Sequence, residues 1–459
     1  MENPESSSLD SIRNELLMAR RFSFWSGKKT TFFAEKDVSR LTSKETIERV
    51  VLEDNNIELS QKPKFINHVY ENACKLFLMF IYSGLPIHLL KDIGYTDNDF
   101  PLSIDFVSMF LSFELPIGHY DIELENLLST NQWKFTVPEL SWTGGHTKFH
   151  PDSIPPITSM VGIGSGSSAT IYKIEIDSNY IAEGIQQPFA LKVIPPFYLF
   201  SAKEKLRRVK ERDLLNDLRR LGHENIIQLH ASFDYLGQLC MIFPLATCDL
   251  HQYMGQVPPK NNPKYVSWLV RQLRGLADAL SKIHGIGYHG NLKPENILFF
   301  RDSAESEMYG TLQISNFHLA RLHSDTIDTK SSSPGTQRHE PPDFWLSELF
   351  GWDVTSSCDL WSFGCIILEL LVWIHLARGF RENFLRRYQM FYRTGPHGFL
   401  ELHGEVRDLI ERVEYVSRHP SLKELLRVTK DRLLVCYPSQ RWTSAQLLNF
   451  LSTLEETGN

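Results

Sequence analysis

The chain has 459 residues, of which 42% are hydrophobic and 12% aromatic, and its formal net charge is −7 at pH 7. This length leaves room for two to four domains with large buried cores, as in an ordinary globular protein. The acidic balance gives no sign of a nucleic-acid-binding surface, so we expect no nucleic-acid partner.

The first ten residues are polar and acidic, and they lack the basic and apolar segments of a secretory signal. Six scattered cysteines show no metal-ligand spacing and suit free thiols in a reducing compartment. We therefore expect a cytoplasmic protein, with the nucleus as an open alternative.

Residues 1–150 are predicted to form a mainly helical region. Helical patterns cover Thr42 to Asp54 and Phe65 to Ser83, where apolar residues recur every three or four positions. We find no catalytic constellation there, and the sequence does not indicate a role for this region.

Two apolar runs, Leu76 to Tyr82 and Cys365 to Leu376, raise the question of a membrane span. Both are shorter than the ~20 residues that a spanning helix needs. We therefore expect two buried core helices and no membrane partner.

A Gly/Pro-rich stretch from Trp142 to Pro156 marks a domain edge. After it, short β-type runs surround one long helix predicted over Ser201 to Leu221, and the chain is mostly helical from Tyr265 onward. This order indicates an α+β arrangement, with a small β-rich lobe before a larger helical lobe. The predicted strands are Ile171 to Ile176, Phe189 to Ile194, Ile226 to Phe233 and Leu239 to Phe243.

Two motifs in the small lobe suit a phosphate ligand. Val161 to Lys173 reads VGIGSGSSATIYK, whose glycines let backbone amides approach phosphates, although a plain Gly/Ser turn between strands is the alternative. Phe189 to Lys192 reads FALK, and a lysine among such buried neighbours needs an anionic partner.

Further motifs follow in the helical lobe. Tyr288 to Leu298 reads YHGNLKPENIL, and Leu312 to Arg321 reads LQISNFHLAR. Downstream come PPD at Pro341 to Asp343 and DLWSFG at Asp359 to Gly364, and Arg441 lies near the end of the chain.

In this order and spacing, the motifs resemble those of the protein kinases, with a spelling closest to the serine/threonine branch. The resemblance covers residues 157–456. It implies a bilobal α+β protein-kinase fold, with a small lobe over 157–246 and a large lobe over 247–456, preceded by the helical region 1–150.

The resemblance implies a role for each matching position in ATP binding. Gly164, Gly166 and Ala169 are in register with the family's Gly-rich loop, and Lys192 matches the lysine that contacts the α and β phosphates. The backbone of Leu245 and Ala246 matches the hinge that is available to an adenine ring.

Both acidic positions of the catalytic centre are amides. Asn291 stands where the family has its catalytic Asp, and Asn316 stands where it has the metal-binding Asp of D-F-G, with His318 in place of the glycine. Lys293 and Asn296 keep the positions of the phosphate-contacting lysine and the metal-binding asparagine. An amide can orient a hydroxyl but cannot accept its proton, and it is a weaker Mg²⁺ ligand than a carboxylate. We therefore expect Mg²⁺ binding to be weak or absent.

Other features implied by the family are open or structural. The helix glutamate that pairs with Lys192 is not identified, because an ungapped count lands on Leu214, whereas Glu211 or Asp213 would serve if the register shifts. The resemblance also implies that Asp343 pairs with Arg441, that Asp359 braces the catalytic loop, that His289 and Phe317 pack between the lobes, and that Thr326 and Thr329 lie in the activation segment.

Two functions remain. One is a pseudokinase, a scaffold or allosteric module that binds ATP but transfers phosphate poorly, as Asn291 and Asn316 suggest. The alternative is an active, unconventional serine/threonine kinase, as the retained Lys192 and Lys293 suggest. Either function implies a protein partner or a protein substrate.

Overall fold

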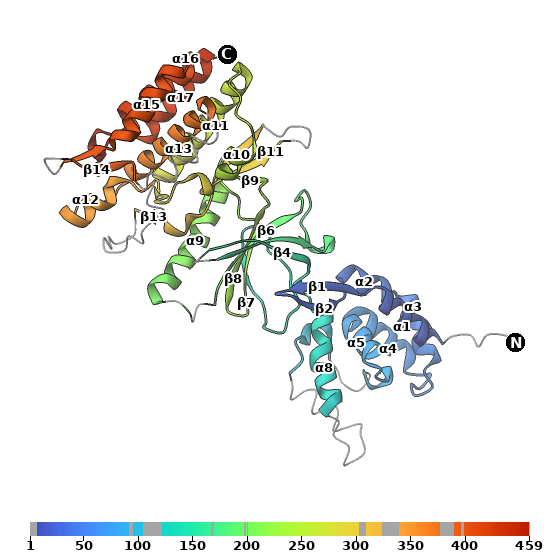
Figure 1. Ribbon diagram of the computed structural model, residues 1–459. Coiled ribbons are helices and arrows are strands. Elements are labelled where there is room, and N and C mark those ends of the chain that lie inside the picture. Colours follow the sequence, from blue (N-terminus) through green and yellow to red (C-terminus); the bar gives the residue numbers. More distant parts are fainter. Residues whose placement is uncertain are drawn as a thin grey trace. The chain divides into compact units, whose positions relative to one another are not determined.

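The computed structural model describes residues 7–90, 95–103, 122–166, 169–196, 199, 201–302, 309–323, 339–376, 390–395 and 399–458. Thr326 and Thr329, which the resemblance places in the activation segment, lie outside these residues. The chain divides into two compact units, drawn with their elements labelled in Figure 1. The first unit contains Met1–Leu199 and His230–Leu245, and the second contains Phe200–Leu229 and Ala246–Asn459.

A six-stranded sheet, in the order β3-β7-β8-β6-β5-β4, is the centre of the first unit. All neighbouring strands are antiparallel except β3 and β7, which run parallel. Its buried face includes Ile174, Leu191 and Ile242. The strands are β3 (His146–Lys148), β4 (Ile157–Ser165), β5 (Thr170–Ile176), β6 (Phe189–Ile194), β7 (Ala231–Tyr235) and β8 (Gln238–Pro244).

The N-terminal part of this unit contains helices and a β-hairpin. The hairpin turns at Ser26 and Gly27, which both have positive φ angles, and the sequence analysis did not predict it. A helical core is formed around α5, which contacts α1, α2, α4 and α8. The elements are α1 (Ser8–Met18), β1 (Arg21–Trp25), β2 (Lys28–Phe32), α2 (Glu35–Leu41), α3 (Lys44–Glu53), α4 (Lys62–Asn72), α5 (Cys74–Ser83) and α8 (Ile122–Phe135).

The helical pattern over Phe65 to Ser83 forms two helices that meet at Ala73 and not one continuous helix. Ala73 is not helical, with φ −139° and ψ 34°. The first N–H groups of α5 are capped from far along the chain, since Asp97 accepts hydrogen bonds from the backbone N–H of Lys75 and Leu76 at 2.9 to 3.1 Å. This tertiary cap satisfies donors that a continuous helix would satisfy internally.

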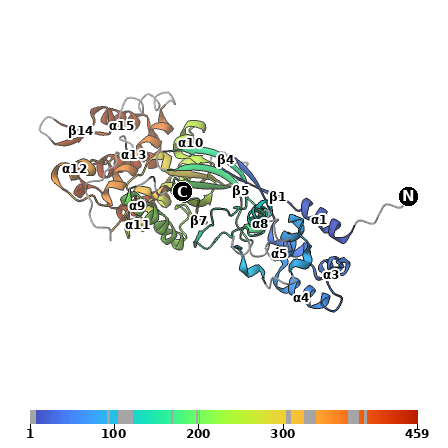
Figure 2. The ribbon, with the colours of Figure 1, turned by 90° about the horizontal axis from the view of Figure 1, so that it is seen from below.

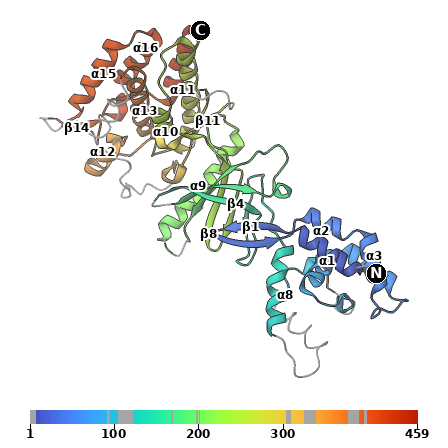
Figure 3. The ribbon, with the colours of Figure 1, turned by 45° about the vertical axis from the view of Figure 1, so that its right-hand side comes forward.

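The hairpin joins the helical region to the sheet. Strand β1 lies beside β4, as Figure 3 shows. Trp25 belongs to the sheet's own core, where its ring meets the edge of Tyr235 at 5.0 Å. Arg21 forms ion pairs with Asp37 at 2.8 Å and with Asp177 at 2.6 Å. The N-terminal region therefore supplies part of the core that stabilises the sheet.

The second unit begins with α9 (Ala202–Leu221), whose N-terminus carries a capping box between Ser201 and Glu204. Helix α11 packs along α17, and Figure 2 shows this helical part from below. Its other helices are α10 (Leu250–Gln256), α11 (Pro263–His284), α12 (Pro342–Phe350), α13 (Ser357–His375), α15 (Gly404–Val416), α16 (Pro420–Val428) and α17 (Ser444–Gly458). Its strands are β9 (Cys248–Asp249), β10 (Gly287–Tyr288), β11 (Ile297–Arg301), β12 (Gly310–Ile314), β13 (Arg321–Leu322), β14 (Tyr392–Thr394) and β15 (Leu400–Leu402).

Helix α13 is the core helix of the second unit. By length and composition alone, Ser357–His375 could cross a membrane, but 94% of this stretch is buried inside the protein. Its position agrees with the core helix that the sequence predicted.

The predicted strand Ile226 to Phe233 is wrong in its first half, because β7 begins only at Ala231. Ile226 instead forms an isolated bridge with Ile314 in the second unit, and the backbone N–H of Ile227 donates to the Ile314 carbonyl at 3.0 Å. The apolar run is buried as expected, but its two halves belong to different units.

Candidate active site

The loop between β10 and β11 is organised around His289, which is fully buried. Its Nε2 donates to the Ser315 carbonyl at 2.9 Å, and its Nδ1 accepts from the backbone N–H of Asn291 at 3.2 Å. One nitrogen donates and the other accepts, so the ring is neutral. Burial lowers the pKa of His289, which favours the same state. The ring also meets Phe317 edge-on at 4.9 Å.

Asp359 of α13 fixes the backbone of this loop. Its carboxylate accepts from the N–H of His289 at 2.7 Å and from the N–H of Gly290 at 2.8 Å, and His284 lies 3.1 Å away. Burial alone would raise the pKa of Asp359, but the contact with His284 and the backbone donor hold it below its ordinary value. The brace implied by the resemblance is present.

Gly290 has a backbone conformation that suits glycine. Its φ is +72°, and a Cβ at this position would lie 3.1 Å from the Leu319 carbonyl oxygen. A side chain here, such as the family's arginine, would be strained in this backbone conformation.

The loop and the start of the short helix η6 (Phe317–Leu319) bring together three of the predicted site residues. The side-chain amide of Asn296 donates to the Asn291 carbonyl at 2.7 Å, and the amide of Asn316 donates to Asn296 Oδ1 at 3.0 Å. Asn316 Oδ1 in turn lies 2.8 Å from Nδ1 of His318. Lys293 lies half-buried in the same loop, immediately before the short helix η5 (Pro294–Asn296).

The Mg²⁺ ion that the kinase fold implies does not fit these residues. The two oxygens that would bind it, on Asn296 and Asn316, each face another protein group of this network at hydrogen-bonding distance. Mg²⁺ prefers anionic oxygens. Across the described part of the chain, no group of three His, Cys, Asp or Glu side chains could hold a metal ion.

Four predicted nucleotide residues belong to the first unit: Gly164 and Lys192 lie on strands of its sheet, and Gly166 and Ala169 lie in the turn between β4 and β5. Strands β4 and β5 form the expected hairpin, in which Gly164 lies opposite Ile171 and the Gly166 N–H donates to the Ala169 carbonyl at 3.0 Å. Lys192 is buried on β6. Leu245 ends the first unit and Ala246 continues into the second, and both are half-buried.

Helix α9 has a buried carboxylate among the candidates that the sequence left open for the helix glutamate of the family's ion pair. Glu211 is only 2% exposed, and its charge acts on the pKa of His289. Asp213, by contrast, is exposed and pairs with Arg212 at 2.7 Å. Leu214 is a core residue. Glu211 is therefore the helix carboxylate whose burial suits the family's ion pair.

The end of the activation segment is attached to the helical core by the ion pair implied by the resemblance. Arg441 Nη1 lies 3.0 Å from Asp343, and both side chains are buried. Arg441 also donates to the Ser357 carbonyl at 2.6 Å. A buried charge is costly unless it is paired and hydrogen-bonded, and Arg441 has both an ion pair and a hydrogen bond here.

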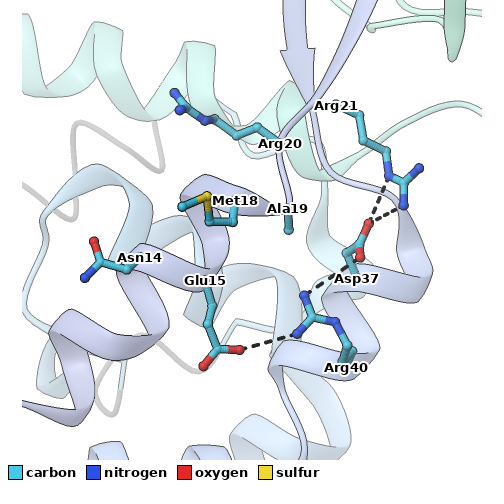
Figure 4. A pocket seen from close by; sticks show the side chains of 8 residues that line it. All are labelled: Asn14, Glu15, Met18, Ala19, Arg20, Arg21, Asp37 and Arg40. Atoms are coloured by element: carbon cyan, nitrogen blue, oxygen red, sulfur yellow. Dashed lines mark hydrogen bonds and ion pairs between the residues drawn. The ribbon is translucent and has the colours of Figure 1, made fainter.

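A separate pocket of about 580 Å³ lies in the N-terminal region. Figure 4 shows that its lining pairs arginines with acids: Arg40 contacts Glu15 at 3.3 Å, and Arg21 contacts Asp37 at 2.8 Å. Because these charges neutralise one another and no nucleophile or acid–base pair faces the pocket, it is not a catalytic candidate.

Comparison with known proteins agrees with this geometry. The model of the protein kinase domain family matches residues 157–450. This chain belongs to the protein kinase family. The α+β kinase fold predicted from the motifs is thereby confirmed.

The relatives of this chain include cyclin-dependent kinases. Cyclin-dependent kinase 14 of Xenopus tropicalis is 29% identical over 314 residues, which cover 62% of this kinase-family chain and 65% of that protein. Cyclin-dependent kinase 15 of Homo sapiens is 34% identical over 211 residues, which cover 45% of this chain and 42% of that protein. The chain thus spans less than two thirds of the length of these relatives.

Sequence reasoning did not foresee the hydrogen bond between His318 and Asn316. The replacement of the D-F-G glycine by histidine was visible in the sequence, but nothing in the sequence showed that its ring nitrogen would meet the neighbouring amide.

Proposed function

We propose that this protein is a pseudokinase, which binds ATP, transfers phosphate poorly or not at all, and acts as a scaffold or allosteric module. The observation that carries the proposal is the pair of amides at Asn291 and Asn316, at the family's two acidic positions. Around them, the supports of the loop, Asp359 and His289, are in place.

The loss of the acid at position 291 acts on the proton-transfer step. An amide oxygen of Asn291 can orient a substrate hydroxyl, but it cannot take the proton that the hydroxyl loses on attack. Positioned acid–base catalysis contributes about 10²–10⁴-fold, equivalent to roughly 3–5 kcal/mol of barrier. Kinases turn over at about 1–100 s⁻¹, so this loss alone would leave only a small fraction of the ordinary turnover rate.

ATP binding does not depend on those two acids. The backbone at Gly164 is open, since no atom lies within 4 Å of a Cβ built there, which suits close approach of a phosphate. Lys192 would supply a positive charge to the α and β phosphates, and the backbone of Leu245 and Ala246 would meet the adenine.

We further propose a protein partner. Two of the relatives are named cyclin-dependent kinases, which makes a cyclin one candidate. Cytoplasmic localisation stays part of the proposal.

The alternative, an active unconventional kinase, is favoured by the retained Lys192 and Lys293. The two proposals separate when the purified full chain is tested for ATP-dependent thermal stabilisation and for phosphate transfer to a generic protein substrate. The pseudokinase proposal predicts stabilisation by ATP, its loss in Lys192→Ala, and no transfer above background. Transfer at ordinary kinase rates that Lys192→Ala abolishes would establish the alternative instead, and no stabilisation would leave a scaffold that does not bind nucleotide.

A further inference from the structure

The side chains at the metal position of the kinase fold form a chain of hydrogen bonds that ends on His318. From Asn291 outward, its links are Asn296 Nδ2 to the Asn291 carbonyl at 2.7 Å, Asn316 Nδ2 to Asn296 Oδ1 at 3.0 Å, and His318 Nδ1 to Asn316 Oδ1 at 2.8 Å. The Asn291 carbonyl oxygen and the side-chain oxygens of Asn296 and Asn316 thus each meet a hydrogen-bond donor.

The direction of the Asn316 amide decides what this site can bind. In the observed orientation, its NH₂ group points at Asn296 Oδ1, so partly positive hydrogens face the oxygen that a cation would need. The reverse orientation would place two amide oxygens about 3.0 Å apart, an unfavourable contact unless a cation lies between them.

His318 favours the first orientation. The Asn291 carbonyl can only accept, so Asn296 turns its NH₂ group to it and its Oδ1 to the NH₂ group of Asn316. Asn316 Oδ1 then faces His318, whose ring stabilises this orientation by donating from Nδ1. A glycine at this position would offer no such donor. His318 therefore acts as a positioning residue, which holds the amide oxygen of Asn316 away from the metal position.

The remaining charges do not restore a cation site. The carboxylate of Asp359 is occupied by the backbone donors of His289 and Gly290 and by His284. The three asparagines are neutral. A divalent ion would have to break two hydrogen bonds and would gain only uncharged ligands from these asparagines, which Mg²⁺ binds weakly.

We propose that this site accepts the nucleotide as a metal-free triphosphate, with His318 as the residue that closes the metal position. The proposal rests on the ATP binding proposed above and specifies the ionic form of the ligand. It implies that protein groups, with Lys293 of the same loop among them, meet the phosphate charges in place of a divalent cation.

The test is the dissociation constant of ATP for the full chain, measured by calorimetry in excess Mg²⁺ and in excess EDTA. We expect the two constants to agree within about threefold, a small difference on a scale where 1.4 kcal/mol is tenfold. ATP binding that is at least about tenfold tighter in Mg²⁺ would overturn this inference while leaving the pseudokinase proposal intact. No binding in either buffer would overturn this inference together with the ATP binding proposed above, and would leave a scaffold that does not bind nucleotide.

A double variant, His318→Gly with Asn316→Asp, tests the assigned cause. It restores the family's residues at both positions, and Asp tolerates the positive φ of +66° at residue 316 as Asn does. We expect binding in Mg²⁺ to become at least about tenfold tighter than in EDTA. The single variant His318→Gly is the matched control, since a purely structural role of the ring would weaken binding equally in both buffers. A double variant that folds and stays insensitive to Mg²⁺ would refute the assignment of Asn316 and His318 as the residues that close the metal position. The comparison of buffers on the unmodified chain decides the proposal even if the variant does not fold.

Discussion

Replacement of Trp25 by alanine tests whether the N-terminal region is part of the kinase sheet's core. Trp25 is only 8% exposed, although its hairpin precedes the glycine-rich stretch of the sheet by more than a hundred residues in the sequence. Its ring contacts Tyr235 at 5.0 Å and Phe233 at 6.2 Å, and both residues belong to β7. Truncation of a buried tryptophan costs about 3–5 kcal/mol, and the two ring contacts contribute to this loss.

This cost is large against the roughly 5–15 kcal/mol by which native domains are stable. Urea unfolding followed by circular dichroism measures the total loss, and hydrogen exchange locates it. We expect faster exchange in peptides from β7 and β8, as well as in those from the hairpin. Met18→Ala is the control, because Met18 is 89% exposed and its truncation should change stability by no more than about 0.5 kcal/mol.

The reasoning is refuted if the exchange rates of β7 and β8 stay unchanged in Trp25→Ala. Such a result would mean that the helical region unfolds by itself and that the sheet does not depend on it.

Three further predictions concern the second unit. Asp343→Ala leaves Arg441 buried without its carboxylate, so stability should fall by about 3–5 kcal/mol in urea unfolding, and a loss below about 1 kcal/mol would contradict the buried pair. Gly290→Ala should lower the thermal midpoint through about 1–2 kcal/mol of left-handed backbone strain, and an unchanged midpoint would contradict it. Burial lowers the pKa of His289 below 6.5 in the folded state, so below about pH 6.5 the unfolded chain binds more protons than the folded chain. The free energy of unfolding should therefore fall as the pH drops from about 6.5, and the urea midpoint should fall with it. His289→Gln should make the urea midpoint less dependent on pH.

The motifs of the large lobe were readable from the sequence because each depends on residues close together in the chain. The helix predicted over Ser201 to Leu221 begins one residue later, at Ala202, since Ser201 and Glu204 form a local capping box. The ion pair of Asp343 with Arg441 followed from the family's pattern, and the structure confirms it.

Features set by distant contacts were not readable. The break at Ala73 depends on a cap from Asp97, which lies 22 residues after Lys75. The hairpin at Ser26 and Gly27 has a local turn signal, but its contact with β4 depends on residues far along the chain.

The candidate site shows the same division. The amides at Asn291 and Asn316 and the histidine at 318 were predicted from the sequence, because only the residue type at each matching position is needed to identify them. It left the helix carboxylate open, and the burial of Glu211 favours that residue over Asp213. The direction of the Asn316 amide depends on two side chains whose positions only the fold determines.

The central claim is that two neutral amides prevent efficient phosphate transfer in a fold that is otherwise intact. Single-turnover transfer of the γ-phosphate from ATP to a protein substrate tests it most directly, for the unmodified chain beside Asn291→Asp with Asn316→Asp. The account predicts transfer at background level in the unmodified chain and a rate at least about 10²-fold higher in the double variant. Transfer by the unmodified chain at about 1 s⁻¹ or faster, within the range of ordinary kinases, would contradict it.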